Sequence, residues 1–575
     1  MVSYRISPYL SFIENRLFPG IVQYAVCHRL SGTILEPDET VRSRLLAGQF
    51  SHSVSLSEED LNGAGRDVVQ FRELIDREFL ISEGYDPLST FQNHYVARPI
   101  QNPALTYHSS SGEVVLVRTS MAFQVFSPRR NELPEVIEEP LSPAAAKIFE
   151  LADGTKTLQE IFNALRQENG QLDESEFVEA VMFLTTQERQ LIKVTTNPED
   201  LFDPFKPVNT VPRNLYHADR WVSESQDSAP DAILDFHRDG IEEASWEFDL
   251  IEPTVNHAFR FPNESFGGVN YGSRFCTAIL RPALVSALGG TDRLEVLEVG
   301  GGTGTFARAF LGQAQQAQID LNYHILDLSP ALIENQKKVL ADLSSEIEHF
   351  EQDATKFDLP GEQFDLIVAN EVIADFPMAS VERRLSEESD VNQKRKWQGE
   401  GVCYIEKYQL ATDDAPNTFV VSAGAFKFVE RCWQHLSPGG TLIVTEYGRP
   451  HIYPVQSVHL NHDEYSIHFS HLATCAAKVG FSWKLLTLKE FLAIDDEVRV
   501  LNGREEHILC LNHVLRQHGK FLPYAVISQS EFEKQFQEVS AAVKLTGFSF
   551  STLSTGYHFG PRIADFMVMI MHKPA

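Results

Sequence analysis

Acidic and amide side chains stand at the ends of apolar runs in the second half of the chain. Glu298 lies at the end of one run, Asp327 closes the next, and Asp353 follows a little further on. A later run ends in Asn370 and Glu371. Because the carboxyl ends of parallel strands meet at one edge of a sheet, we expect these side chains to line one crevice.

Glycines follow the first of these runs. Gly300, Gly302 and Gly304 lie between the strand that contains Glu298 and a helical pattern that begins near Thr305. Glycine suits such a turn because a residue without Cβ lets a ligand approach the backbone. A lone glycine run is weak evidence, since dinucleotide-binding folds use a similar one.

The order of the landmarks favours one ligand. Asp327 is positioned to accept hydrogen bonds from both ribose hydroxyls with Leu328 beside it, and Asp353 to meet an adenine amino group next to Ala354. S-adenosylmethionine is a sulfonium compound that has no pyrophosphate and carries an ammonium group. A carboxyl group such as that of Glu298 can therefore lie near this ligand. The spacing indicates an S-adenosylmethionine site and therefore a methyltransferase; the alternative is ordinary turns of a doubly wound sheet.

A loop-to-helix segment, 261–275, precedes the first sheet strand. Such segments commonly cover a cofactor, so we expect Tyr271 and Arg274 to bind the cofactor carboxylate, the arginine through a bidentate fork. The alternative for Arg274 is an ion pair with a surface acid. Asn370 is the remaining predicted cofactor contact.

The candidate catalytic residues lie near the same crevice. Glu371 is placed to accept a substrate N–H, and Asp375 is one helical turn further on, with a helix-face acid as the alternative. His462 and Tyr465, in the loop after a strand that ends at Tyr447, are expected substrate contacts together with Asp463.

Four histidines between 459 and 471 also suggest a metal, but no carboxylate accompanies them convincingly. We expect no metal site.

Four regions separate along the chain. Residues 1–107 form an N-terminal α+β region, 112–194 a clearer unit, 195–240 a linker rich in Pro, Asp and Ser, and 241–575 an α/β pattern of helices alternating with apolar strands. The charged stretch 379–419 is expected to be an inserted cap over the substrate cleft, or else a solvated charge run.

The second region predicts a small winged helix. Two short strands, near 114–117 and 123–125, precede a helix capped by Ser142, and a capping box at Thr157 opens a second helix. A third helix covers 177–184 and a strand follows at 191–194. The same helix-to-strand ending at 74–81 suggests that the first region is a degenerate repeat of this unit.

Composition restricts the partners. The 575 residues include 80 acidic and 49 basic ones, a formal net charge of -31, so nucleic acid and anionic membrane are poor partners. No run approaches the roughly 18 apolar residues of a membrane span, and the first eight residues do not resemble a secretory signal. Six dispersed cysteines without a CxxC pair fit reduced thiols, so we expect a cytoplasmic protein.

Two parts of the chain contain motifs that resemble those of known protein families. Residues 370–377, NEVIADFP, and 440–448, GTLIVTEYG, resemble segments of the MidA-like methyltransferases, which include protein-arginine methyltransferases. This chain departs from that family at Ala374–Asp375, where the family has Asp then Ala, and at Glu446, which replaces Asp. The resemblance implies a Rossmann-like methyltransferase fold over about 260–490.

Residues 141–157 look like the PqqD-like precursor-peptide recognition domain, with its DGT-x-T turn. That resemblance implies that 112–194 bind the leader of a ribosomal peptide as an added strand next to the third helix; a winged helix for packing or nucleic-acid binding is the alternative. Together the halves are similar to proteusin amide N-methyltransferases and imply leader-guided methylation of asparagine side chains. The open alternatives are arginine methylation of a folded protein and a non-catalytic scaffold.

Overall fold

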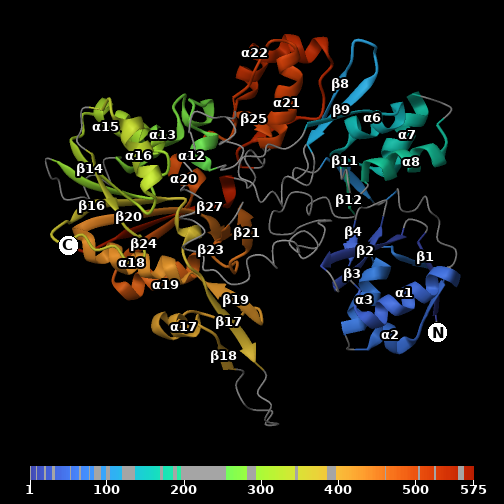
Figure 1. Ribbon diagram of the computed structural model, residues 1–575, viewed down its shortest axis with the longest axis horizontal. Coiled ribbons are helices and arrows are strands. Elements are labelled where there is room, and N and C mark those ends of the chain that lie inside the picture. The colour runs from blue at the N-terminus through green and yellow to red at the C-terminus, as the bar shows by residue number, and fades with distance from the viewer. Residues whose placement is uncertain are drawn as a thin grey trace. The chain divides into compact units, whose positions relative to one another are not determined.

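A computed structural model describes residues 2–195, 254–280 and 293–575, with gaps at 8–9, 19–20, 29–32, 36, 52, 64–65, 77, 83–91, 93, 99–103, 120–135, 169–171, 186–190, 344–346, 385–395, 460–461, 503–504, 524–525 and 555–562. The chain forms two compact units (Figure 1). Of the predicted linker 195–240, only Thr195 is described, as the last residue of a strand. The expected strand at Phe123 and Val125 lies outside the described residues.

The first unit begins with strands and helices in a fixed order. The elements are β1 (Val2–Ile6), β2 (Leu10–Phe18), β3 (Ile21–His28), β4 (Thr33–Leu35), α1 (Glu39–Ser51), β5 (Ser53–Leu56), α2 (Glu58–Asn62), α3 (Arg66–Asp76) and β6 (Leu80–Ser82). Strands β2, β3 and β4 form one antiparallel sheet, and β5-β1-β6 form another.

The next region repeats that order. Its elements are β7 (Tyr95–Ala97), β8 (Ala104–His108), β9 (Val114–Thr119), β10 (Val136–Pro140), α6 (Pro143–Leu151), β11 (Asp153–Thr157), α7 (Leu158–Glu168), α8 (Glu174–Thr185) and β12 (Lys193–Thr195). Strands β8, β9 and β10 form an antiparallel sheet and β11-β7-β12 another. The two regions therefore share one topology, which the predicted repeat requires.

Local chemistry explains the helix starts of the second region. The Ser142 hydroxyl accepts a hydrogen bond from the Ala145 N–H, with Pro143 in the first turn of α6. Thr157 and Glu160 exchange side-chain-to-backbone hydrogen bonds at the start of α7, so the predicted capping box is present. The apolar faces of α6, α7 and α8 pack into one buried core.

Two later segments, Glu506–Leu522 and Gln535–Phe548, belong to this first unit rather than to the catalytic one predicted for 241–575. They include most of α21 (Glu505–Gln517) and part of α22 (Gln529–Ala542). The reason is strand pairing: the backbones of Thr106 in β8 and Thr546 exchange two hydrogen bonds of 2.7 and 2.8 Å. The outer edge of β8 is thereby covered by the chain's own carboxyl-terminal region.

The second unit is built on a mostly parallel sheet of order β15-β14-β13-β16-β20-β27-β24. Its strands are β13 (Leu294–Val299), β14 (Leu321–Asp327), β15 (Ile347–Glu351), β16 (Phe364–Asn370), β20 (Leu436–Arg449), β24 (Ser482–Thr487) and β27 (Phe566–His572), with β23 (Ile467–His468) beside β20. Strand β27 is antiparallel to both neighbours, so the expected final strand enters the sheet between β20 and β24.

Helices cover both faces of this sheet (Figure 1). One face carries α13 (Tyr271–Ile279), α15 (Thr305–Gln316) and α16 (Pro330–Leu340), and the other α18 (Ala423–His435) and α19 (Phe469–Val479). Shorter elements are α12 (Val255–Ala258), η2 (Glu264–Phe266), η3 (Ile373–Asp375), α20 (Leu488–Leu492), β25 (Arg499–Asn502), β26 (Ser549–Thr552) and η4 (Ile563–Asp565). The strands are buried on both sides, which is the expected α/β Rossmann-like arrangement.

The expected insertion follows η3. Strands β17 (Ala379–Arg384), β18 (Lys396–Gln398) and β19 (Thr418–Val421) form an antiparallel sheet, and α17 (Val402–Tyr408) packs near it. A hairpin of β21 (Gln456–His459) and β22 (His462–Tyr465) lies after β20, and β22 contacts η3. Among the described residues, no helix is long and apolar enough to cross a membrane.

Candidate active site

A cavity opens at the carboxyl ends of β13, β14 and β16. It is lined by most of the residues predicted from the sequence to bind the cofactor: Glu298, Gly300, Gly302, Asp327, Leu328, Asp353, Ala354 and Asn370. Glu371 and Asp375 line it as well. Strand ends far apart in the sequence meet there because the strands are parallel and adjacent.

The glycine turn shapes one wall. Gly300, Gly302 and Gly304 have φ angles of 71°, 51° and 88°, a backbone region that other residues rarely adopt. A Cβ on Gly300 would lie 2.5 Å from a methyl carbon of Val372. Gly304 itself does not line the cavity; it is the N-cap of α15 and sits against Gln336.

Glu298 is a buried carboxyl group in this wall. Its Oε2 accepts a hydrogen bond of 2.9 Å from the Tyr323 hydroxyl. Burial raises the pKa of Glu298 to about 8, the Tyr323 bond opposes that shift, and the neighbouring Asp327 adds to it. The group is therefore largely uncharged at neutral pH until a cation approaches it.

Asp327 lies at the end of the adjacent strand. Its two carboxylate oxygens accept hydrogen bonds from the Ser329 N–H at 3.0 Å and from the Gln336 amide at 2.9 Å. Burial raises the pKa of Asp327 to about 6, although these hydrogen bonds hold it down. The side chain is thus fixed, anionic at neutral pH, and exposed to the cavity on its remaining lone pairs.

Asp353 lines the cavity from the loop after β15. Its Oδ1 accepts hydrogen bonds from the backbone and hydroxyl of Thr355, and its Oδ2 lies 3.1 Å from the Lys356 ammonium. The turn fixes the direction of residues 352–355, so Asp353 and the buried Ala354 are presented together.

Asn370 and Glu371 form the opposite wall. The Asn370 Oδ1 accepts hydrogen bonds from the Tyr271 hydroxyl and the Thr445 hydroxyl. Glu371 has a φ of 54°, and its Oε2 accepts a hydrogen bond of 2.9 Å from the Val255 N–H. The segment that contains α12 is therefore tied to this carboxylate.

A third carboxyl group, Glu446 on β20, lies behind Glu371 and Asp375. It accepts hydrogen bonds from the Ala374 N–H at 3.1 Å and the Tyr447 N–H at 2.9 Å. Burial raises the pKa of Glu446 well above its usual range, and the negative charges of Glu371 and Asp375 add to the shift. The uncharged form of Glu446 is therefore favoured, and its hydrogen bond to Ala374 connects β20 with η3.

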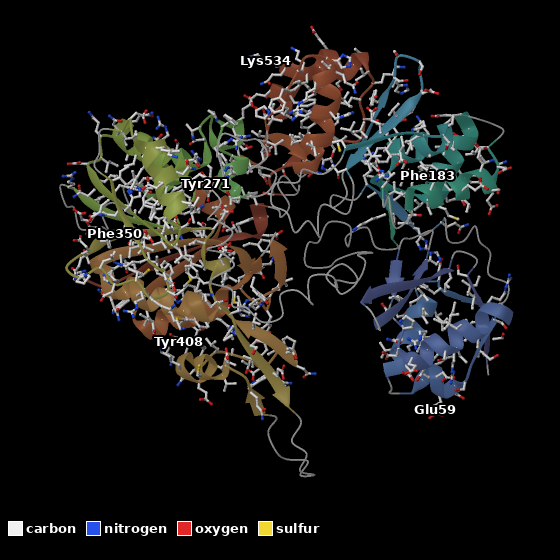
Figure 2. The ribbon with its side chains drawn as sticks, viewed as in Figure 1. Glu59, Phe183, Tyr271, Phe350, Tyr408 and Lys534 are labelled. Atoms are coloured by element: carbon white, nitrogen blue, oxygen red, sulfur yellow. The ribbon has the colours of Figure 1, made fainter. Side chains whose placement is uncertain are left out.

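Two predicted cofactor contacts lie elsewhere. The guanidinium of Arg274 donates to the carbonyl oxygens of Leu492 and Ala493 at 2.7 and 2.8 Å and does not line the cavity. The geometry therefore does not support a bidentate contact between Arg274 and the cofactor carboxylate. Tyr271, labelled in Figure 2, is fully buried. Its hydroxyl donates to Asn370, and it is not among the residues that line the cavity.

The structure describes only some of the residues in the predicted substrate loop. His462 and Tyr465 are the first and last residues of β22, which contacts η3. Tyr465 is not among the described residues that line the cavity, and the side chain of His462 lies outside the described part of the structure. Of the four histidines, His468 and His471 stack with ring centroids 3.8 Å apart, and His471 hydrogen-bonds the Ala411 carbonyl. Among the described residues no group of three metal-ligating side chains forms a metal site.

Several lining or supporting residues were not predicted. Thr254, Asn256 and His257 line the cavity from the segment that follows the linker, and burial lowers the pKa of His257 to about 3. Thr445 supports Asn370 from the neighbouring strand. For Thr445, the sequence indicated only that it lies in a predicted strand, and not that its side chain contacts Asn370.

Comparisons with known proteins agree with this reading of the site. Residues 282–462 match a family model described as "Putative S-adenosyl-L-methionine-dependent methyltransferase". A non-reducing polyketide synthase of Gibberella zeae is 34% identical over 98 residues, which are 16% of this chain and 4% of that protein. The chain thus spans only a small part of the length of this curated relative.

Solved structures are also similar. An uncharacterized protein from Burkholderia thailandensis is 19% identical, with 52% of this chain and 79% of that chain covered and a TM-score of 0.33. A "likely methyl transferase" from the same organism, bound to S-adenosyl-homocysteine, is 18% identical, with 57% and 86% covered and a TM-score of 0.32. A phosphoethanolamine N-methyltransferase from Haemonchus contortus is 15% identical, with 51% and 52% covered and a TM-score of 0.26.

The cavity residues fit the cofactor on their own chemistry. The glycine turn lines the cavity with backbone, with open space beside Gly302, and Asp327 offers anionic acceptors to a ribose. The buried carboxyl group of Glu298 is available to an ammonium, which would favour its ionised form. Residues 282–462 carry the family match over the strands and loops that build this cavity. Residues 282–462, with the cavity that they help to build, therefore form an S-adenosylmethionine-dependent methyltransferase domain.

Proposed function

We propose that the enzyme methylates side-chain amide nitrogens, mainly of asparagine, in a ribosomally synthesised precursor peptide under leader guidance. The observation that carries the choice of nitrogen is the charge of the cavity. Its described lining contains five carboxyl groups and no lysine or arginine: Glu298, Asp327, Asp353, Glu371 and Asp375. Such a lining repels carboxylate and phosphate acceptors and accommodates an N–H donor.

An amide nitrogen is a poor nucleophile because its lone pair is delocalised into the carbonyl. The protein must orient the nitrogen and accept its proton, and Glu371 lies on the cavity wall where an acceptor is needed. Asp375 lines the cavity beside it and is placed to orient the amide NH₂. The cofactor supplies the electrophilic methyl group.

For leader binding we propose the sheet β8-β9-β10 of the first unit. Its β8 edge is already paired with Thr546, whereas β10 pairs only with β9 among the described residues. An extended peptide that adds on the β10 side would extend this sheet by one strand. The cytoplasm, where thiols stay reduced, is the location we propose for this reaction.

Arginine methylation of a folded protein is the second candidate, and one observation favours it. Glu371 and Asp375 bring two carboxyl groups together at the acceptor side of the cavity, with Glu446 behind them. A guanidinium binds paired carboxylates bidentately, so this cluster also suits arginine.

The test compares acceptor peptides on the full-length enzyme. We incubate it with labelled S-adenosylmethionine and a precursor peptide, either with its leader or as the core alone, and locate the methyl groups by tandem mass spectrometry. We expect label on asparagine side chains and a core-only rate at least about tenfold lower, restored in part by leader added in trans. Equal rates with and without leader contradict leader guidance, and label on arginine contradicts the amide proposal.

A further inference from the structure

A hydrogen-bond network with two fully buried hydroxyl groups supports the wall of the cavity at Asn370 and Glu371. Tyr271, the first residue of α13, donates its hydroxyl proton to the Asn370 Oδ1 at 2.6 Å. Thr445 of β20 donates to the same oxygen at 2.7 Å. Tyr271 and Thr445 are both 0% exposed, so neither hydroxyl has water as an alternative partner.

These two donors fix the orientation of the Asn370 amide. With Oδ1 held between two hydroxyl groups, Nδ2 must point the other way, and it lies 3.3 Å from the Glu371 Oε1. The other oxygen of that carboxylate, Oε2, accepts from the Val255 N–H at 2.9 Å. Each oxygen of Glu371 thus has a protein donor.

The backbone of Glu371 is held in an unusual conformation. Its φ of 54° lies in the left-handed region, which is unfavourable for a residue that carries a Cβ. The Glu371 N–H donates to the Thr445 carbonyl at 3.0 Å, so the strand that supports Asn370 also supports this turn. Such strain persists only where the surroundings determine the conformation, as they do here.

The charges around the network fix the direction of its hydrogen bonds. Burial raises the pKa of Tyr271 well above its usual range, and the charge of Glu371 adds to the shift, so the tyrosine remains a donor. The other carboxyl groups of this region are those of Asp327, Asp375 and Glu446. The described hydrogen bonds of the Asn370 side chain go to Tyr271, Thr445 and Glu371 instead. Asn370 therefore faces Glu371 with its N–H and not with its carbonyl.

We propose that Tyr271 and Thr445 are positioning residues that act through Asn370 to hold Glu371 as the acceptor of the substrate N–H proton. The inference rests on the proposed function for the identity of the acceptor nitrogen. The sequence predicted that Tyr271 contacts the cofactor. The proposed role is instead to hold Asn370, which itself lines the cavity.

The reaction at this site is the transfer of a methyl group from sulfur to the substrate nitrogen. The substrate nitrogen forms a bond to the methyl carbon, and the electron pair of the broken carbon–sulfur bond remains on sulfur, which becomes a neutral thioether. The nitrogen loses its proton to the Glu371 carboxylate, and the proton then passes to solvent. The Asn370 N–H stabilises the carboxylate form before the transfer, which keeps the base available at neutral pH.

The test uses Tyr271→Phe and Thr445→Val, which remove one donor each with little change in shape. Tyr408→Phe and Thr441→Val are matched controls, since they remove a buried hydroxyl from a tyrosine of α17 (Figure 2) and from the same strand as Thr445. We measure kcat and the KM for the cofactor as functions of pH, with whichever acceptor the wild-type enzyme methylates.

In each test variant we expect kcat to fall about tenfold, the cofactor KM to stay within about twofold, and the acid limb of the kcat profile to move up by about one pH unit. Asn370→Asp, which accepts from both hydroxyl groups but cannot donate to Glu371, should move the limb further. The controls should behave as wild type. A Tyr271→Phe enzyme with lower thermal stability but an unmoved acid limb overturns the proposal, because a merely structural hydroxyl would give that result.

A second measurement does not depend on the acceptor. The titration of Glu371 is followed by pH-difference infrared spectroscopy of the enzyme without peptide, its band assigned by comparison with Glu371→Gln. A higher titration midpoint in Tyr271→Phe than in wild type supports the positioning role even if the peptide proves not to be the substrate. Equal midpoints contradict the positioning role even if asparagine is methylated.

Discussion

The two sides of the cavity are built in different ways. The cofactor side consists of Glu298, Gly300, Asp327 and Asp353, which lie in or just after three strands that follow one another in the sequence. The acceptor side consists of Asn370, Glu371, Asp375 and Glu446, supported by α12, α13 and β20 from distant parts of the chain. The cofactor, which many enzymes share, is therefore bound by local turns. The position of Glu371, the proposed acceptor of the substrate proton, depends instead on tertiary contacts.

The largest expected effect is on the acceptor side. Glu371→Gln keeps the size of the side chain and removes the base, so we expect kcat to fall by about a thousandfold with the cofactor dissociation constant within about threefold of wild type. Single-turnover methyl transfer and calorimetry measure the two quantities. Glu362→Gln, an exposed glutamate in the turn before β16, is the control and should be normal. Equal losses of binding and of rate would remove the distinction between the two sides.

The next effect is on the cofactor side. Asp327→Ala removes the anionic acceptor offered to the ribose, and two hydrogen bonds to a charged group correspond to about 100-fold or more in affinity. We expect calorimetry to show that loss for S-adenosylmethionine and S-adenosylhomocysteine alike. Asp320→Ala, an exposed residue just before the same strand β14, should leave affinity unchanged. A normal affinity in Asp327→Ala would contradict its role in the ribose site.

The smallest effect is a pH dependence of the cofactor side. The raised pKa values, about 8 for Glu298 and about 6 for Asp327, mean that the folded, cofactor-free protein binds more protons than the unfolded chain above pH 5. Its stability should therefore fall as pH rises through this window. An ammonium beside Glu298 favours the carboxylate, so cofactor affinity should rise severalfold between pH 6 and pH 8, and the cofactor should raise Tm more at pH 8. Scanning calorimetry measures this, and a larger increase at pH 6 would contradict it.

The sequence predicted the cofactor side well because each of its residues is positioned by the element next to it. Glu298 and Asp327 follow from strand ends, and the glycines from the need for positive φ. The contacts of Arg274 could not be predicted in this way, since its partners, Leu492 and Ala493, lie more than 200 residues away. A pattern specifies which face a residue occupies, but not which distant carbonyl its side chain reaches.

The same limit applies to the first unit. The helices of the second region, with caps at Ser142 and Thr157, were predicted from local signals. Nothing local indicates that Thr546 pairs with Thr106, because the partners are 440 residues apart and the pairing uses backbone groups that every sequence has. The assignment of 241–575 to one domain was therefore too simple.

That pairing has a consequence for biosynthesis. During translation β8 is made more than 400 residues before Thr546, and β27, which lies between β20 and β24, is made after both of these strands. The outer edge of β8 and the facing edges of β20 and β24 therefore lack these partners until the later segments leave the ribosome. The growing polypeptide therefore carries exposed strand edges for most of its synthesis, a condition that favours aggregation, so we expect folding in the cell to depend on chaperones that shield those edges.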